Sequence, residues 1–234
     1  IMVFSYAPVL IDAGPDVSIC LNDSVTLGGS PTGNPGSSYT WSGAGLLDSS
    51  NVANPMTVSL FDTIFILQVI DSNTCIAYDT ISFNSLELPV LDAGIDQSAC
   101  IGETVVIGGA PSGDVSSSFS WSLGQSLNDS TIANPSYMVA DTSSFVLMVT
   151  DTNSCVAYDT AVVNAFPLSV LNLQNDTTIC QNIVLPLGNT QPASFTTFNW
   201  TPGTLTTDST VAQTPANMNN TTQYVLEATD IYGC

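Results

Sequence analysis

The chain contains no lysine, no arginine and no histidine among its 234 residues, whereas 20 residues are acidic, so its formal charge is −20. Without Lys or Arg, no cationic side chain can neutralise the phosphates of a nucleic acid. Without His, the usual general base and the commonest transition-metal ligand are missing, and no Ser-His-Asp or Cys-His arrangement can form. We therefore predict a protein that binds no nucleic acid and is not an enzyme.

Long apolar runs and helical patterns are missing as well. No run approaches the roughly 20 apolar residues of a membrane span, and the apolar opening Ile1–Phe4 lacks the basic region of a signal peptide. No segment repeats apolar residues at helical spacing over three turns. The hydrophobic fraction of 44% argues against disorder, and Val, Ile, Thr, Ser, Gly, Pro and Asn, which favour strands and turns, dominate. The composition predicts an all-β protein.

The chain repeats with a period of about 80 residues. Corresponding residues recur in three copies: Cys20, Cys100 and Cys180; Gly28, Gly108 and Gly188; Trp41, Trp121 and Trp200; Pro55, Pro135 and Pro215; and Cys75, Cys155 and Cys234. We predict repeats at residues 9–88, 89–168 and 169–234. Residues 1–8 are expected to be the last strand of a preceding repeat, and the third repeat is expected to lack its own last strand.

Short strands bounded by turns are expected within each copy. In the second copy they are residues 97–100, 104–108, 118–122, 136–139, 145–150 and 156–163, with Trp121 pointing inward. About seven short strands and one inward Trp indicate an immunoglobulin-like β-sandwich. We predict tandem sandwiches in a linear array, with short junctions stiffened by Pro8, Pro89 and Pro167.

The first residues admit two interpretations. Aligned by the period, Ile1–Phe4 corresponds to Ile81–Asn84, near the end of a repeat. We expect the chain to be a window of a longer array of repeats. The alternative is donor-strand exchange, in which residues 1–8 of one chain complete the third repeat of the next.

Six cysteines allow 15 connectivities, and the repeat reduces these to two schemes. Pairing across junctions leaves Cys20 and Cys234 unused, whereas pairing within copies uses all six. We predict the second scheme, Cys20–Cys75, Cys100–Cys155 and Cys180–Cys234, in which each loop of about 55 residues contributes about 4 kcal/mol in the chain-entropy estimate. Zinc is disfavoured because no C-x-x-C pair or His is present. Disulfides imply an extracellular setting.

The order of these motifs carries a resemblance. Asp12–Cys20 (DAGPDVSIC), Val25–Gly29 (VTLGG), Tyr39–Ser42 (YTWS) and Val69–Cys75 (VIDSNTC), with their later copies, resemble the PKD-like and immunoglobulin-like repeats of large Bacteroidota surface proteins exported by the type nine secretion system. The giant adhesins of gliding cells belong to this group. The resemblance implies an extracellular stalk or filament whose partners are neighbouring repeats, surface glycans or other filament chains.

Aspartates recur near the expected domain ends. A cluster of Asp12, Asp16 and Asp71, and its copy Asp92, Asp96 and Asp151, would suit Ca²⁺, which binds carboxylate and carbonyl oxygens. The alternative is that each aspartate caps a turn through its own hydrogen bonds. No other cofactor is predicted. A carboxylate pair for glycoside hydrolysis is disfavoured because the same residues recur in every copy.

Serine or threonine follows aspartate at seven places. The resemblance implies O-glycan attachment in this context, at Ser24, Thr63, Thr80, Ser130, Thr160, Thr177 and Ser209. A eukaryotic origin would direct attention to Asn22, Asn128, Asn175 and Asn199 instead.

Two functions remain open at this stage. The first is a structural repeat segment of an extracellular filament or adhesin stalk on a bacterial surface, serving adhesion or gliding. The second is a binding module that recognises glycan or protein through loops at a domain end. An aromatic cluster in one copy alone would favour the second, and Phe195, Phe198 and Trp200 lie close together in the third copy only.

Overall fold

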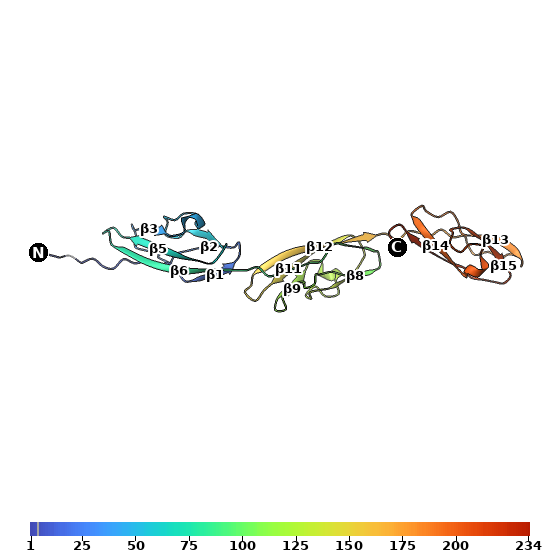
Figure 1. The fold of residues 1–234 in the computed structure, drawn as a ribbon, viewed down its shortest axis with the longest axis horizontal. Coiled ribbons are helices and arrows are strands. Elements are labelled where there is room, and N and C mark those ends of the chain that lie inside the picture. Colours follow the sequence, from blue (N-terminus) through green and yellow to red (C-terminus); the bar gives the residue numbers. More distant parts are fainter. Residues whose placement is uncertain (4) are drawn as a thin grey trace. The chain divides into compact units, whose positions relative to one another are not determined.

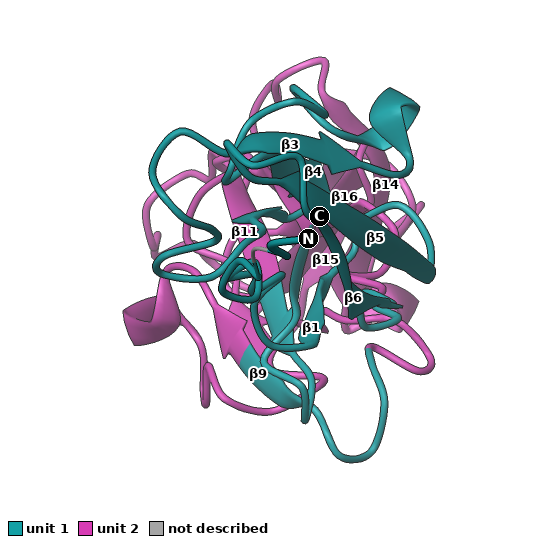
Figure 2. Ribbon diagram, turned by 90° about the vertical axis from the view of Figure 1, so that its left-hand side faces the viewer, with its two compact units in different colours: residues 1–91, 113–119, 148–158 teal, residues 92–112, 120–147, 159–234 magenta. Residues whose placement is uncertain are grey.

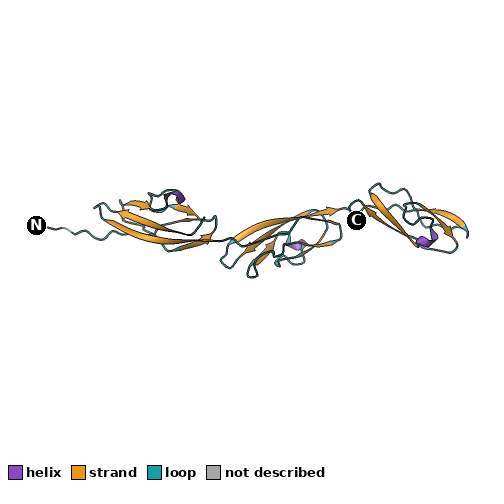
Figure 3. Cartoon of the chain, in the orientation of Figure 1, coloured by secondary structure: helices purple, strands orange, loops and turns teal. Residues whose placement is uncertain are grey.

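The computed structural model of the chain describes residues 1–3 and 5–234, so Phe4 of the opening segment lies outside the described residues. The described part is all-β, with three short 3-10 turns (Figures 1 and 3). Its strands are β1 (Val17–Cys20), β2 (Ser24–Thr26), β3 (Ser38–Trp41), β4 (Met56–Val58), β5 (Thr63–Ile70), β6 (Ile76–Leu86), β7 (Gln97–Cys100), β8 (Thr104–Val106), β9 (Ser118–Trp121), β10 (Ser136–Met138), β11 (Ser143–Thr150), β12 (Val156–Phe166), β13 (Ile183–Leu187), β14 (Phe195–Thr201), β15 (Thr214–Met218) and β16 (Val225–Asp230).

Two compact units divide the chain (Figure 2). Unit 1 comprises residues 1–91, 113–119 and 148–158, and unit 2 comprises residues 92–112, 120–147 and 159–234. Each of the two disulfides lies within one of these units.

The first repeat folds as two facing sheets. One has the order β1-β6-β5-β3, in which β5 pairs antiparallel with β3 and β6 while β1 runs parallel to β6. The other is the antiparallel pair β2-β4. In an immunoglobulin-like sandwich, two antiparallel sheets pack face to face. Here the pair β2-β4 is one sheet, and the antiparallel strands β3, β5 and β6 form the other, with β1 added at its edge. The predicted fold class is confirmed.

Alternation of apolar and polar residues along these strands builds the core. In β5, Phe65, Leu67 and Val69 are buried, whereas Ile64 and Ile66 are exposed. The core of the first repeat consists of Ala13, Leu27, Trp41, Phe65, Leu67, Val69, Ile81 and Phe83. The inward Trp is confirmed in all three copies, since each is at most 4% exposed. Each indole N–H also donates to a backbone carbonyl, at 3.0–3.1 Å, so none of these three buried indole donors is left unpaired.

The second repeat has the same strand order, β7-β12-β11-β9 with the pair β8-β10. Its β7 again runs parallel to β12. The third repeat differs, because it contains only the pairs β13-β15 and β14-β16 within the described residues. Residues 177–180, which correspond to β1 and β7, form no strand there. In the first two repeats that strand pairs with the last strand, and no described residue follows β16 as a strand in the third.

The repeated glycine marks a turn that admits no side chain. Gly28 has a φ of +100°, and a Cβ at this position would lie 2.5 Å from the amide nitrogen of Asn54. That amide donates to the carbonyls of Leu27 and Gly29 and to Thr32 Oγ1, at 3.1, 3.3 and 3.1 Å. Glycine is therefore required both by the positive φ and by the approaching amide.

Candidate functional site

The direction of the first strand separates the two cysteines of each repeat. Because β1 runs parallel to β6, Cys20 lies opposite Leu86, at the end of β6, whereas Cys75 immediately precedes Ile76, at its start. A strand as long as β6 spans roughly 33 Å at about 3.3 Å per residue. A disulfide requires Cα atoms within about 7 Å. Cys20 and Cys75 therefore cannot meet, and the predicted pairing within repeats is wrong.

The disulfides join successive repeats instead. Cys20 bonds to Cys155 with a Cα–Cα distance of 5.5 Å, and Cys100 bonds to Cys234 at 5.6 Å. In each bond, the first cysteine is the last residue of β1 or β7. The second cysteine belongs to the following repeat: Cys155 immediately precedes β12, and Cys234 is the equivalent residue of the third repeat. This pairing also excludes the other two predicted bonds, Cys100–Cys155 and Cys180–Cys234. The two other cysteines are free thiols: Cys75 is half-buried and Cys180 is exposed.

A tight turn precedes the second cysteine of each repeat. In the first repeat, Asp71 Oδ1 accepts hydrogen bonds from the backbone N–H groups of Asn73 and Cys75, at 2.8 and 2.9 Å. In the second repeat, Asp151 Oδ1 accepts the same two bonds from the N–H groups of Asn153 and Cys155, at 2.8 Å each. The Asp four residues before the Cys is thus the residue that shapes the turn.

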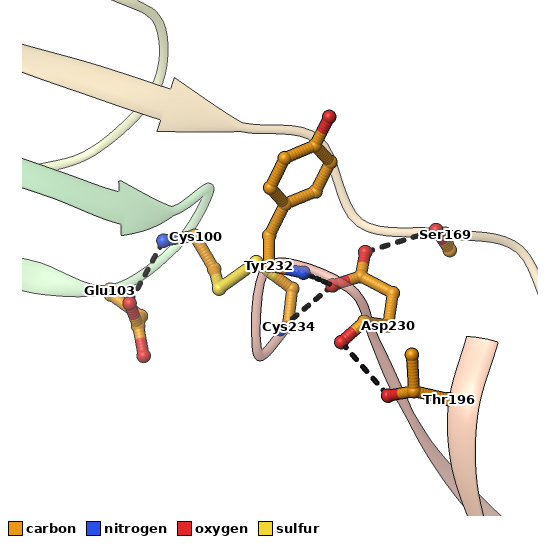
Figure 4. Close-up of a disulfide and its surroundings, with 7 residues drawn as sticks. All are labelled: Cys100, Glu103, Ser169, Thr196, Asp230, Tyr232 and Cys234. Atoms are coloured by element: carbon orange, nitrogen blue, oxygen red, sulfur yellow. Dashed lines mark hydrogen bonds between the residues drawn. A yellow bond between two sulfur atoms is a disulfide. The ribbon is translucent and has the colours of Figure 1, made fainter. Parts of the chain in front are cut away.

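Figure 4 shows how the Cys100–Cys234 bond is held. Asp230 Oδ1 accepts hydrogen bonds from the N–H groups of Tyr232 and Cys234, and Asp230 Oδ2 accepts one from Ser169 Oγ, at 2.9, 3.0 and 3.1 Å. On the other side, the Cys100 N–H donates to a carboxylate oxygen of Glu103 at 2.9 Å. Both cysteines therefore lie on hydrogen-bonded turns, which limits the freedom of the bond.

The surroundings of Asp230 determine the direction in which its pKa is shifted. Burial alone would raise the pKa of Asp230, but the hydrogen bonds from Tyr232, Cys234 and Ser169 outweigh it and lower the pKa below its ordinary value. The ring of Tyr232 also stacks on Phe166, with centroids 4.3 Å apart and an interplanar angle of 12°. An ionised carboxylate and an aromatic stack therefore flank the disulfide within unit 2.

The structure does not bring the predicted calcium ligands together. Asp12 and Asp92 each accept a hydrogen bond from the glycine two residues later, at 2.9 and 2.8 Å. Asp16 and Asp96 accept from the N–H groups of Ser82 and Val162, at 2.8 and 2.9 Å. Asp71 and Asp151 instead shape the cysteine turns that precede β6 and β12. Among the described residues, no group of three or more Asp, Glu or Cys is placed to hold a metal ion.

No structural role was predicted from the sequence for Asp79 and Asp159. Asp79 Oδ2 accepts a hydrogen bond from the Ala13 N–H at 2.8 Å, and Asp159 Oδ2 accepts one from the Ala93 N–H at 2.9 Å. Each bond joins the segment before the first strand to the last strand of the same repeat. The signal was available, because Asp79 and Asp159 recur at the period of the repeat.

The predicted modification sites are accessible to different degrees. Ser24, Thr80, Thr160 and Thr177 are exposed, whereas Thr63, Ser130 and Ser209 are half-buried. Asn22, Asn128, Asn175 and Asn199 are exposed. Accessibility is a requirement for glycan attachment at either set.

The aromatic residues of the third repeat divide between core and surface. Trp200 belongs to the core and is 3% exposed. Phe195 and Phe198 are half-buried, with ring centroids 6.1 Å apart. They line a shallow hollow of about 340 Å³ together with Gln191 and Ala212.

Comparisons with known proteins give a weak likeness only. No protein-family model matches the chain, and no curated protein matches it in sequence. Among solved structures, the chain is similar to the titin domains I67–I69 (an E-to-A variant) at 9% identity, covering 97% of this chain and 95% of that one, with a TM-score of 0.37. It is similar to the first eight Ig domains of Down Syndrome Cell Adhesion Molecule at 12% identity, covering 95% of this chain and 36% of that one, with a TM-score of 0.37. The fold assignment rests on the strand order and core described above. Among the described residues, no helix has the length and apolar character needed to cross a membrane.

Proposed function

We propose that this chain is a structural repeat segment of an extracellular filament or adhesin stalk on a bacterial surface, serving adhesion or gliding. The observation that carries the proposal is the pair of disulfides that tie each repeat to the next, Cys20–Cys155 and Cys100–Cys234. Two repeats joined by a linker alone separate under tension when the linker extends. A junction that also contains a disulfide transmits tension through a second covalent path.

The two loops closed by the disulfides overlap in sequence, so we call the two bonds interlocked. Cys100 lies inside the loop closed by Cys20–Cys155, and Cys155 lies inside the loop closed by Cys100–Cys234. Unfolding of a single repeat therefore cannot release its full length while both bonds remain. This property suits a segment that carries load between a cell and a distant tip.

The composition supports an exposed setting. Disulfides persist in oxidising, extracellular environments. Uniform negative charge keeps chains soluble and apart, and a chain without Lys or Arg offers no cleavage site to trypsin-like proteases. The resemblance of its motifs to repeats of Bacteroidota surface proteins supports a bacterial origin.

The proposal includes a linear row of the repeats 9–88, 89–168 and 169–234, which small-angle X-ray scattering tests. A compact single domain of this length would have a radius of gyration of about 17 Å. A stalk segment should give a value far above that, unchanged by dilution. A radius near 17 Å for the oxidised chain contradicts the stalk.

Glycan attachment at the exposed threonines is part of this proposal. Thr80 and Thr160 occupy the same place on the last strands of two repeats, β6 and β12, and both are exposed. Intact-mass measurement of native material should exceed the 24.4 kDa of the bare chain. A mass equal to the bare chain removes the glycan from the proposal and leaves the stalk untouched.

A second candidate function is a binding module that recognises glycan or protein through the hollow at Phe195 and Phe198. The observation that favours it is that aromatic faces suit sugar rings and protein anchors, and this pair occurs in the third repeat alone. A glycan array probed with the chain and with Phe198→Ala tests it, with Tyr158→Ala, an exposed aromatic elsewhere, as the control. Binding lost only in Phe198→Ala would support the module, and an absence of binding would dismiss it.

A further inference from the structure

The outward side of the larger sheet in the first repeat is apolar. Along β5 and β6, which lie side by side (Figure 1), every second side chain points away from the core. Four apolar side chains on this side are 45–65% exposed: Ile64, Ile66, Ile76 and Tyr78. They form one surface, because Tyr78 lies opposite Gln68, which follows Ile64 and Ile66 on the same side of β5. We call the outward side of β3, β5 and β6 the outer face.

The outer face is also uncharged, although the chain has a formal charge of −20. Its other members are Ser38, Thr40, Gln68, Ile70, Thr80, Ser82 and Asn84. Asp79 is the one acidic residue in the three strands, and it lies on the opposite side of the sheet, where its Oδ2 accepts a hydrogen bond from the Ala13 N–H at 2.8 Å. The acidic side chains of the chain are therefore kept off this surface.

Charge indicates which partner the outer face fits. A basic partner gains most from the acidic parts of the chain, and the outer face offers it no carboxylate. A second copy carries the same −20 and is repelled except where neither surface is charged. Two outer faces placed against each other meet that condition, and two-fold symmetry lets the same residues serve both sides. In a filament, another copy is also the surface that this face meets most often.

We propose that copies of this chain associate laterally through the outer face of the first repeat. The inference rests on the proposed filament function and deepens it by naming the surface between chains. Three strands about 4.8 Å apart, with the eight residues of β5 at about 3.3 Å each, give a face of about 14 Å by about 26 Å. Two such faces bury about 750 Å² in total, which is below the size of a stable interface. The association is therefore weak and requires a high local concentration of chains.

The outer face includes one proposed glycan acceptor. Thr80 lies opposite Ile66, so a glycan at Thr80 would cover the face and hold two copies apart. The association therefore belongs to chains without a glycan at that position. In the third repeat, Glu227 occupies the place of Gln68, so the corresponding surface there carries a charge and is not expected to associate.

Sedimentation equilibrium tests the proposal on material whose intact mass is the 24.4 kDa of the bare chain. The weight-average mass should rise toward that of a dimer between about 0.1 mM and about 2 mM chain, the range of a weak complex. Added salt should strengthen the association, because it screens the repulsion between two acidic chains and leaves the apolar contact intact. A constant mass at every concentration, or an association that weakens as salt is added, would overturn the proposal.

Two matched variants test whether the outer face is the surface of contact. Ile66→Glu adds a charge to the outer face, whereas Val58→Glu adds the same charge to the outward side of β4, and the two positions are 45% and 42% exposed. Ile66→Glu should weaken the association by about tenfold or more, and Val58→Glu should leave it close to that of the parent. Gln68→Glu, a nearly isosteric change, should weaken it as well. Equal effects of Ile66→Glu and Val58→Glu would contradict the assignment.

The stalk and the lateral contact can fail independently. In dilute solution the chains are single, and further dilution leaves the radius of gyration that tests the stalk unchanged. The parent chain, Ile66→Glu and Val58→Glu should share that radius and one melting temperature, since both substituted side chains are exposed. A stalk-like radius with no association at high concentration removes only the lateral contact.

Discussion

Interlocked disulfides predict an unusual response when the chain is stretched from its two ends. In the oxidised chain the taut path runs from residue 1 to Cys20, through the bond to Cys155, back along the backbone to Cys100 and through the second bond to Cys234. About 74 residues lie on that path, which extends to about 260 Å at about 3.5 Å per residue. Reduction frees all 234 residues, which extend to about 820 Å.

Removing one bond should release little length. The variant Cys20→Ser/Cys155→Ser leaves only the Cys100–Cys234 bond, so the taut path runs from residue 1 to Cys100 and then to Cys234. About 100 residues lie on it, an extension of about 350 Å and a gain of only about 90 Å. Breaking the second bond then adds about 470 Å. The gains are unequal because residues 100–155 belong to both loops.

Single-molecule force spectroscopy with tethers at the two termini measures these lengths. The control is Cys75→Ser/Cys180→Ser, which removes the two free thiols and should leave the oxidised extension at about 260 Å. Pairing within repeats would instead give a gain of about 190 Å for each bond removed, including any bond of Cys75. A lengthened control, or equal gains for successive bonds, would refute the interlocked arrangement.

Three further outcomes follow from the aspartates. Asp71→Ala should lower the free energy of unfolding by about 1–3 kcal/mol, because two hydrogen bonds to a charged group are lost; urea denaturation measures it, and an equal loss in Ser72→Ala, an exposed neighbour, contradicts it. The pKa of Asp230 is lowered on folding, so its contribution to stability is present above the pKa of the unfolded chain and is lost as pH falls through the folded pKa. Thermal unfolding between about pH 2 and pH 6 should therefore decline less steeply for Asp230→Asn than for the parent, and parallel curves would dismiss this linkage. Calcium or EDTA should leave the melting temperature unchanged, because the six candidate aspartates accept hydrogen bonds from backbone N–H groups at separate places, four of them in turns and Asp16 and Asp96 from the last strand; a rise with calcium would restore the metal site.

The strands of each repeat could be predicted from the sequence because their causes are local. Alternating apolar residues, turn residues at regular spacing and one Trp per copy are sufficient to predict strands such as 97–100 and 118–122, and the structure has them at 97–100 and 118–121. The last strand was predicted at 156–163 and extends to Phe166. The error lies at the end of the strand, where pairing with β7 rather than local preference keeps the backbone extended.

The disulfide pairing could not be predicted in the same way, because it depends on the direction of one short strand. If β1 ran antiparallel to β6, Cys20 would lie near Cys75, as the prediction within repeats required. The parallel register of Val17 with Phe83 and Cys20 with Leu86 puts the cysteines at opposite ends of the repeat. A period common to all cysteines cannot distinguish a partner in the same copy from one in the next. The predicted cluster of Asp12, Asp16 and Asp71 does not form among the described residues for the same reason, since it relied on that bond to gather them.

The absence of cations and the position of the disulfides are related. A pair of opposite charges across a junction needs a basic side chain, and a chain with 20 acidic and no basic side chains cannot form such a pair. Its charges repel one another over about 8 Å at physiological salt, the range that matters at a junction. A disulfide across that junction is insensitive to this repulsion and to the salt that screens it. The hydrogen-bonded turns of Asp151 and Asp230 use acidic groups to hold Cys155 and Cys234 in place. Acidic side chains therefore exclude ionic contacts between repeats and also position the cysteines of the covalent ones.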